Sequence, residues 1–327
     1  MKKRTLDELI KEYRELYEIL IVTPKSRGIA SDLWDNWEKD GVTRPDIQQI
    51  ATDVDTLESK FFEELTALTS ELEGRPLHVA YFSFITLHYN FAASTAVDGY
   101  LVLVDEAFFR LAFFLVFALY AIAQMRLPEA TRADLKHEIL EVVVKGYHER
   151  DLIAVDQLST LFTLLNSSYD IAEGSNYLFQ SIKTFVLGHE LGHHARSHVD
   201  GTEQIRYALS EQILTFEIDN RSWENEFEAD EFGYRVFLAA LNTAPEREYT
   251  HLKYVFPFGP LLFFDICERL AIITGDSKVV RHSKTHPPLQ QRREALIKKF
   301  AIDTQDPLYV EVYKALDFLF SPLANQH

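Results

Sequence analysis

The stretch 185–198, FVLGHELGHHARSH, contains four of the twelve histidines of this chain. Its segment 189–193, HELGH, sets His189 and His193 four positions apart. On an α-helix such residues differ by only about 40° around the axis, so both imidazoles project to one side, one turn apart. The flanking FVLG and Leu191 are apolar. The sequence therefore predicts a largely buried helix with one polar edge, which presents two imidazole nitrogens to a common point.

Two imidazole nitrogens at this spacing can share one Zn²⁺ ion. Glu190 lies about 100° around the helix from His189, where its carboxylate can take a proton from an attacking water without becoming a ligand. A histidine pair four residues apart can equally be a solvated face or a hydrogen-bonded pair in the core. The pentapeptide alone leaves both interpretations open.

A catalytic zinc ion needs a third protein ligand. The pattern HExxHxxGxxH would require a glycine at position 196 and a histidine at 199, but the chain has Arg196 and Val199 there. If the helix continued, His198 would lie about 180° from His189 and could not reach the same ion. We therefore expect His198 to pack or to form hydrogen bonds. His194, about 100° off the ligand face, is expected at the surface or behind a ligand.

The segment 223–239, WENEFEADEFGYRVFLA, offers a second helix with Glu226 and Asp230 on one face. Glu226 can ligate the ion while Asp230 accepts the outer N–H of His189, which would fix the orientation of that ring. Ala229 is small, so this helix can approach the first one closely. The alternative is a solvated acidic face. Three other acidic residues of the segment compete for the ligand role: Glu224, Glu228 and Glu231.

A third segment, THPPLQQR at 285–292, reads as the start of a helix, because proline is favoured at the first helical position. His286 would lie in the loop just before that helix and could donate to a developing oxyanion, or it could cap or pack. Arg292 closes the segment.

Together these segments resemble the gluzincin metallopeptidases of the CaaX-prenyl-protease and HtpX-like family. Members carry HELGHxxxxH, then ExxAD, then (S/T)HP-P-x-x-x-R, and this chain has the same three patterns in the same order, over about residues 88–297. A weaker similarity is to the Lit-type phage-exclusion peptidases. Many members of the first family have several membrane spans, whereas this chain shows no convincing span, and in this respect it departs from the family.

The resemblance implies a zincin-like core and one Zn²⁺ per chain, held by His189, His193 and Glu226. It also implies Glu190 as the general base and Asp230 as the partner of a ligand.

The resemblance further suggests a substrate-binding strand. Asn90-Phe91-Ala92 partly matches the family's Asn-Ala-Phe-Ala segment, which leads into an edge strand beside the active site. The run YLVLVD at 100–105, with Val102 and Val104, would then be that edge strand, and a peptide substrate could pair with it.

Periodicity predicts an α+β fold that is mostly helical, with a small sheet formed within residues 76–104. Further helices are expected at 5–21, 52–73, 131–147, 151–166, 203–219, 222–241, 259–273, 288–300 and 307–319, with a polar break at 166–176. The expected domains are an N-terminal helical region at 1–75, a zincin-like metallopeptidase domain at 76–300 and a C-terminal helix packed on it at 301–327.

The apolar run 107–125 has two interpretations. Residues 111–125 carry no charge, but 15 residues of helix span only about 22 Å, short of the roughly 30 Å hydrocarbon core of a membrane. Extending the run upstream brings in Arg110, which is costly in a bilayer. A buried core helix is therefore favoured over a membrane-inserted one.

A net charge of −17 argues against nucleic-acid partners and against an anionic membrane surface. Cys267 is the only cysteine, and the N-terminus lacks a secretory pattern, so we expect a cytoplasmic protein. The oligomeric state is not readable.

The expected function is that of a zinc endopeptidase acting on a protein or peptide. The rivals are a non-catalytic zinc-binding sensor module on a peptidase fold, a membrane-associated protease that uses 107–125, and a helical interaction protein without metal.

Overall fold

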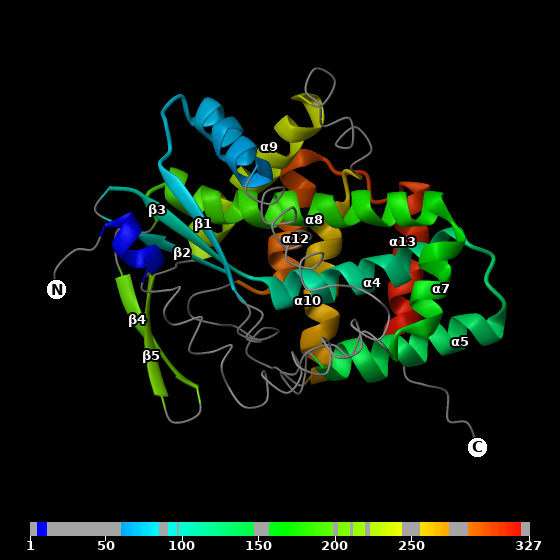
Figure 1. Ribbon diagram of the computed structural model, residues 1–327. Helices are drawn as coiled ribbons and strands as arrows, with labels where there is room; N and C mark the ends of the chain where they lie inside the picture. The colour runs from blue at the N-terminus through cyan, green and yellow to red at the C-terminus, as the bar shows by residue number, and fades with distance from the viewer. Residues whose placement is uncertain are drawn as a thin grey trace.

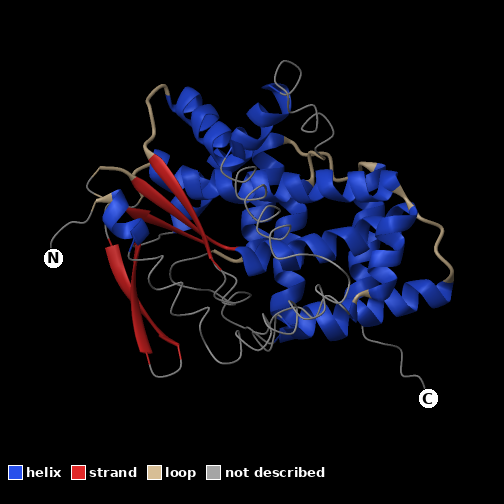
Figure 2. Ribbon diagram, in the orientation of Figure 1, coloured by secondary structure: helices blue, strands red, loops and turns tan. Residues whose placement is uncertain are grey.

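A computed structural model of the protein describes residues 5–11, 60–84, 91–96, 98–146, 157–198, 202–209, 212–219, 223–243, 256–274 and 287–321. The fold is α+β and mostly helical, as expected (Figure 2). Residues 6–11 and 60–73 are helical. The elements that follow are β1 (Val79–Phe84), β2 (Phe91–Thr95), β3 (Tyr100–Asp105), α4 (Glu106–Gln124), α5 (Glu129–Glu138), the π-helix η1 (Ile139–Val144), α7 (Ser159–Ser167), α8 (Tyr169–Ala195), β4 (Thr202–Leu209), β5 (Gln212–Asp219), α9 (Trp223–Thr243), α10 (Gly259–Thr274), α12 (Leu289–Phe300) and α13 (Pro307–Phe320).

The main sheet has three strands in the order β1-β3-β2, with β3 parallel to β1 and antiparallel to β2. Figure 1 shows this sheet beside the C-terminal end of α8. The runs expected to be strands became β1 and β3, while β2 was not expected. The expectation that 100–105 is an edge strand is wrong, because β3 is central. Val102 is paired with Tyr81 on one side and Ala93 on the other, so neither it nor Val104 can offer a free backbone edge to a substrate.

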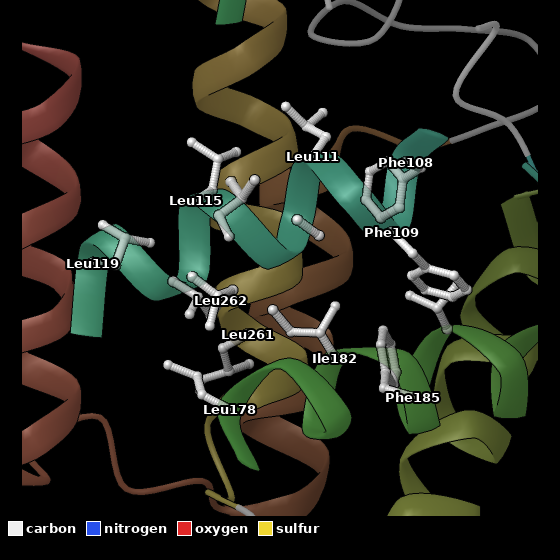
Figure 3. Packing of buried hydrophobic residues seen from close by; sticks show 14 of the residues in the cluster. Phe108, Phe109, Leu111, Leu115, Leu119, Leu178, Ile182, Phe185, Leu261 and Leu262 are labelled. Atoms are coloured by element: carbon white, nitrogen blue, oxygen red, sulfur yellow. The ribbon is translucent and has the colours of Figure 1, made fainter. Parts of the chain in front are cut away.

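Helix α4 lies in the hydrophobic core. Its residues Leu111, Leu115 and Leu119 are fully buried, and Figure 3 shows α4 next to labelled core side chains of α8, among them Leu178, Ile182 and Phe185. A helix with so much apolar surface must be covered by other elements, and α8 and α13 pack against it here. The core interpretation of 107–125 is confirmed. Within the described residues, no helix has the length and apolar character needed to cross a membrane.

The two described parts of the N-terminal 75 residues both pack on the rest of the chain. Leu9 joins a small cluster with Leu101 and Leu103 of β3, and the helix at 60–73 contributes Phe62 and other residues to the main core. The C-terminal helix α13 packs against α4. The domain boundaries themselves stay a prediction.

One expectation about local structure is too broad and another is wrong. The polar break expected at 166–176 is confined to Ser168, between the end of α7 and the start of α8 at Tyr169; Ser168 caps α8 by accepting from the Ile171 N–H. Residues 203–219 are not a helix but the antiparallel pair β4–β5. The sequence of each half alternates polar and apolar residues with a period of two, for example Ile205, Tyr207 and Leu209, as a strand requires.

Helices α8 and α9 pack at unusually short range through small residues. A Cβ added at Gly188 would lie 3.2 Å from Gly233 Cα, and one at Gly192 would lie 3.2 Å from Ala229 Cα. A Cβ at Gly233 would lie 2.7 Å from the backbone nitrogen of His189. The expected close approach at Ala229 is therefore observed, and it brings the ligand-bearing faces of both helices together.

The first prediction concerns this contact. Replacing Gly233 with alanine should lower the free energy of unfolding by about 1–3 kcal/mol, because backbone atoms of α8 cannot move aside cheaply. Without a clash, the same change inside a helix would stabilise the protein by up to about 1 kcal/mol. Denaturant unfolding measures the sign, with the exposed Arg235→Ala on the same helix as control. A Gly233→Ala variant more stable than wild type would contradict the packing argument.

A polar cluster of Arg293, Asp265 and Tyr309 holds α12 against α10 and α13. Arg293 Nε lies 2.8 Å from Asp265 Oδ1, and the Tyr309 hydroxyl donates to Asp265 Oδ2 at 3.1 Å. Arg293 also donates to the Tyr309 oxygen. Burial raises the pKa of Asp265 to about 6, although the charge of Arg293 and the hydrogen bond from Tyr309 act in the opposite direction. The preceding residue, Arg292, is thereby held in a fixed register on α12.

This raised pKa predicts a pH dependence of stability. The fold favours the neutral Asp265 carboxyl, so its contribution is complete below the unfolded pKa of about 4 and is lost as pH rises through about 6, by at most about 3 kcal/mol. Asp265→Asn should therefore gain stability relative to wild type between pH 4 and pH 7. Unfolding midpoints across this range provide the measurement, and the exposed Asp317→Asn is the control. Parallel curves for wild type and Asp265→Asn would refute the burial effect.

Candidate metal centre

Three helices contribute the polar side chains of one buried cluster. α8 supplies His189, Glu190 and His193 near its C-terminal end, and α9 supplies Glu226 and Asp230 near its start. α12 supplies a further side chain, described below. The five residues from α8 and α9 are all buried. The i,i+4 spacing on each helix explains why each pair points the same way.

His189, His193 and Glu226 offer ligand atoms to a common point. The two Nε2 atoms are 3.1 Å apart, and the Glu226 oxygens lie 3.8 Å from Nε2 of His189 and 3.6 Å from Nε2 of His193. A tetrahedral ion with bonds of about 2.0–2.1 Å would hold its ligand atoms roughly 3.3 Å apart. The observed distances are close to that, and the three residues are at most 7% exposed. The donor set and its spacing therefore fit a divalent metal ion.

Asp230 determines the tautomer of His189. Its Oδ1 lies 2.9 Å from Nδ1 of the imidazole. Burial by itself would raise the pKa of Asp230, but the charge and hydrogen bonds of Arg292, with those of His189, outweigh it and hold the pKa below its usual value. An ionised carboxylate only accepts, so Nδ1 of His189 carries the proton and Nε2 is left with a lone pair. That lone pair is what a metal requires.

Arg292 is the charged partner of both carboxylates on α9. Its guanidinium donates to Asp230 Oδ2 at 2.7 Å and to Oδ1 at 2.6 Å, and Nη1 lies 3.0 Å from Glu226 Oε2. Burial would lower the pKa of Arg292, but Asp230 and Glu226 raise it instead, so the side chain stays charged. Three carboxylates, counting Glu190, face one guanidinium, and a divalent cation would neutralise the remaining formal charge.

Glu190 lies next to the ligand trio without being part of it. Its Oε1 is 4.0 Å from His189 Nε2, and the side chain is buried. The sequence placed it about 100° around the helix, and its position in the structure agrees with that geometry. Its carboxylate is within reach of a small molecule held near the two imidazoles.

The rival acidic residues of α9 face elsewhere. Glu228 binds His198, and Glu231 pairs with Arg235 and Lys299. Glu224 is exposed. Among the described acids of this helix, Glu226 is therefore the one that faces both imidazoles.

The other two histidines of the stretch are both in contact with neighbouring rings. His194 is fully buried, with its ring centroid 4.5 Å from that of Tyr100, so a surface position for it is wrong. His198 contacts His193, as a hydrogen-bonding group. Asn90 and His286 lie outside the described residues.

The third position to test is Arg292. Arg292→Met keeps most of the side-chain length but leaves Asp230 and Glu226 buried without a positive charge. We expect the metal-free protein to lose about 3–5 kcal/mol of unfolding free energy, because an uncompensated buried charge is costly. Chemical denaturation in the presence of a chelator measures it. Arg235→Met, which removes an exposed ion pair, is the matched control, and an equally small effect for both would contradict the assigned role.

Comparison with known proteins gives one match. The family model described as Peptidase U49, a Lit-type peptidase family, matches residues 162–312, slightly less than half of the chain. No curated protein matches, and no solved structure matches. The CaaX-prenyl-protease and HtpX-like assignment is not confirmed, whereas the weaker similarity to Lit-type peptidases agrees with this result. The segment that carries the His189, His193 and Glu226 group is thus similar to a peptidase family.

Proposed function

We propose that this protein is a zinc-dependent endopeptidase with a zincin-like core. The observation that carries the proposal is the buried His189, His193 and Glu226 group, which lies within the segment matched by a peptidase family. Two histidines and a glutamate are a donor set typical of catalytic zinc, which keeps a further position open for water or substrate.

Each residue of the cluster has a defined task in this proposal. His189, His193 and Glu226 would hold the ion, which supplies a Lewis acid that polarises the scissile carbonyl. Glu190 accepts a proton from the attacking water and then gives it to the leaving amine. Its distance of 4.0 Å from His189 Nε2 supports this role, because a group that moves protons must lie beside the reacting atoms without occupying a ligand position.

Asp230 and Arg292 keep His189 in the correct state before substrate arrives. Asp230 holds the proton on Nδ1, and Arg292 keeps the Asp230 carboxylate ionised and fixed in direction. Because the rings are held in advance, little reorganisation is needed during the reaction.

The substrate would bind as an extended peptide along β2 rather than β3. β2 is an outer strand that pairs with β3 on one side and contacts both α8 and β5. Among the described strands, no ladder partner occupies its other side. An extended peptide added there would be aligned by main-chain hydrogen bonds beside the helix that carries Glu190.

The decisive variant is Glu190→Gln, which keeps the size of the side chain but cannot accept the proton. We expect unchanged metal content by elemental analysis and a loss of cleavage by at least about 100-fold. Because the substrate is unidentified, new protein N-termini would be compared between cells that express wild type and cells that express the variant. Glu224→Gln, an exposed acid on α9, serves as the control and should behave as wild type.

Three outcomes separate the competing functions. Cleavage that persists in Glu190→Gln would refute the assigned base. Bound metal in wild type without any new N-termini would favour a non-catalytic sensor module. Wild type without metal would favour a helical interaction protein.

A further inference from the structure

Helix α8 ends at Ala195, two residues after His193, in a specific reversal of the chain. The N–H of His198 donates to the His193 carbonyl at 2.9 Å, and the N–H of Ser197 donates to the His194 carbonyl at 3.2 Å. Ser197 has a φ of 56°, in the left-handed region. This pair of bonds with a left-handed residue is a Schellman motif, which folds the chain back over the last turn.

The reversal changes the position expected for His198. A continued helix would have put it on the face opposite His189, but the helix stops at Ala195. The stop is reinforced by Arg75, which donates to the Ala195 carbonyl at 2.8 Å. In a Schellman motif the side chains at the first and last of these positions meet. Here those side chains are His193 and His198.

The His198 ring connects a ligand to a carboxylate. Its Nδ1 lies 3.2 Å from Nδ1 of His193, and its Nε2 lies 2.9 Å from Glu228 Oε2. The ring centroids of the two histidines are 5.4 Å apart. The His198 side chain is only 6% exposed, whereas that of Glu228 is 57% exposed. The contact between His198 and His193 is therefore shielded from water, whereas the Glu228 carboxylate at the other end of this hydrogen-bonded series is exposed.

The direction of these hydrogen bonds follows from the acceptor at the end. The Glu228 carboxylate accepts, so neutral His198 carries its proton on Nε2 and leaves Nδ1 as an acceptor. Nδ1 of His193 must then be the donor between the two rings. His193 is left with a lone pair on Nε2, the atom that lies 3.6 Å from Glu226 Oε1. If His198 instead carried its proton on Nδ1, its unprotonated Nε2 would face the Glu228 carboxylate, and two hydrogen-bond acceptors would be in contact.

We propose that His198 and Glu228 are positioning residues that fix the tautomer and direction of His193, as Asp230 does for His189. The inference rests on the proposed metal site and extends it by two residues. Each ligand imidazole then has its own outer partner: a carboxylate acts directly on His189, and a second imidazole linked to a carboxylate acts on His193. Such partners change metal affinity by about 10–100-fold when removed.

The test compares two substitutions at position 198. His198→Leu removes the acceptor, and His198→Asn places a carbonyl oxygen at the same distance along the side chain as Nδ1. Co²⁺ affinity of the full chain would be measured by chelator competition, with the visible spectrum of bound Co²⁺ as a second readout. We expect His198→Leu to weaken binding about 10–100-fold and His198→Asn to restore it to within a few-fold. The exposed His137→Leu is the control for histidine loss.

Glu228→Ala should weaken Co²⁺ binding by less than His198→Leu, because water can replace an exposed carboxylate. Equal Co²⁺ affinity for wild type and His198→Leu would overturn the proposal. So would a His198→Asn variant as weak as His198→Leu, since ring packing rather than an acceptor would then matter.

A measurement on the metal-free protein separates this inference from the proposed function. Nitrogen-15 spectra of the imidazoles should show His193 protonated on Nδ1 in wild type and in Glu190→Gln alike. A His193 ring protonated on Nε2 would overturn the inference whatever the enzyme does. Absence of cleavage together with the expected tautomer would overturn the proposed function alone.

Discussion

The close approach of α8 and α9 is the constraint on which the site depends. Gly188, Gly192 and Gly233 let the two backbones meet where larger side chains would keep them apart. Only at this separation can a carboxylate from α9 lie within 4 Å of both imidazoles on α8. The same approach excludes water from Glu226 and Asp230. Close packing thus positions the side chains of the site, but it also buries the negative charges of Glu226 and Asp230, which then need a compensating positive charge.

Two adjacent arginines on α12 have different carboxylate partners. Arg292 points into the site and compensates Asp230 and Glu226, while Arg293 points toward Asp265 and Tyr309. The polar cluster of Arg293, Asp265 and Tyr309 holds α12 in register against α10 and α13, so the guanidinium of Arg292 has little freedom to leave. A helix remote in sequence from the HELGH segment is in this way part of the same cluster.

Local patterns in the sequence predicted most of the site. The spacing of HELGH and of ExxAD determines which side chains share a face, and the structure brings those faces together. Three features were not readable because they depend on distant parts of the chain or on weak local signals. The order of strands in a sheet is set by tertiary contacts, so β3 was mistaken for an edge. The hairpin β4–β5 was mistaken for a helix although its alternation was present. The end of α8 carries a serine rather than the usual glycine in the left-handed position, so nothing in HARSH marked the reversal that brings His198 to His193.

The abrupt stop of α8 also places the ligands at one pole of a long dipole. α8 has 27 residues, and His189 and His193 lie in its last two turns. The peptide dipoles of a helix sum to about half a negative charge at its C-terminal end, which favours a cation there by roughly 0.3–1 kcal/mol, and more where the end is shielded from solvent. The backbone of α8 would therefore attract a metal ion to this position before any side chain contributes.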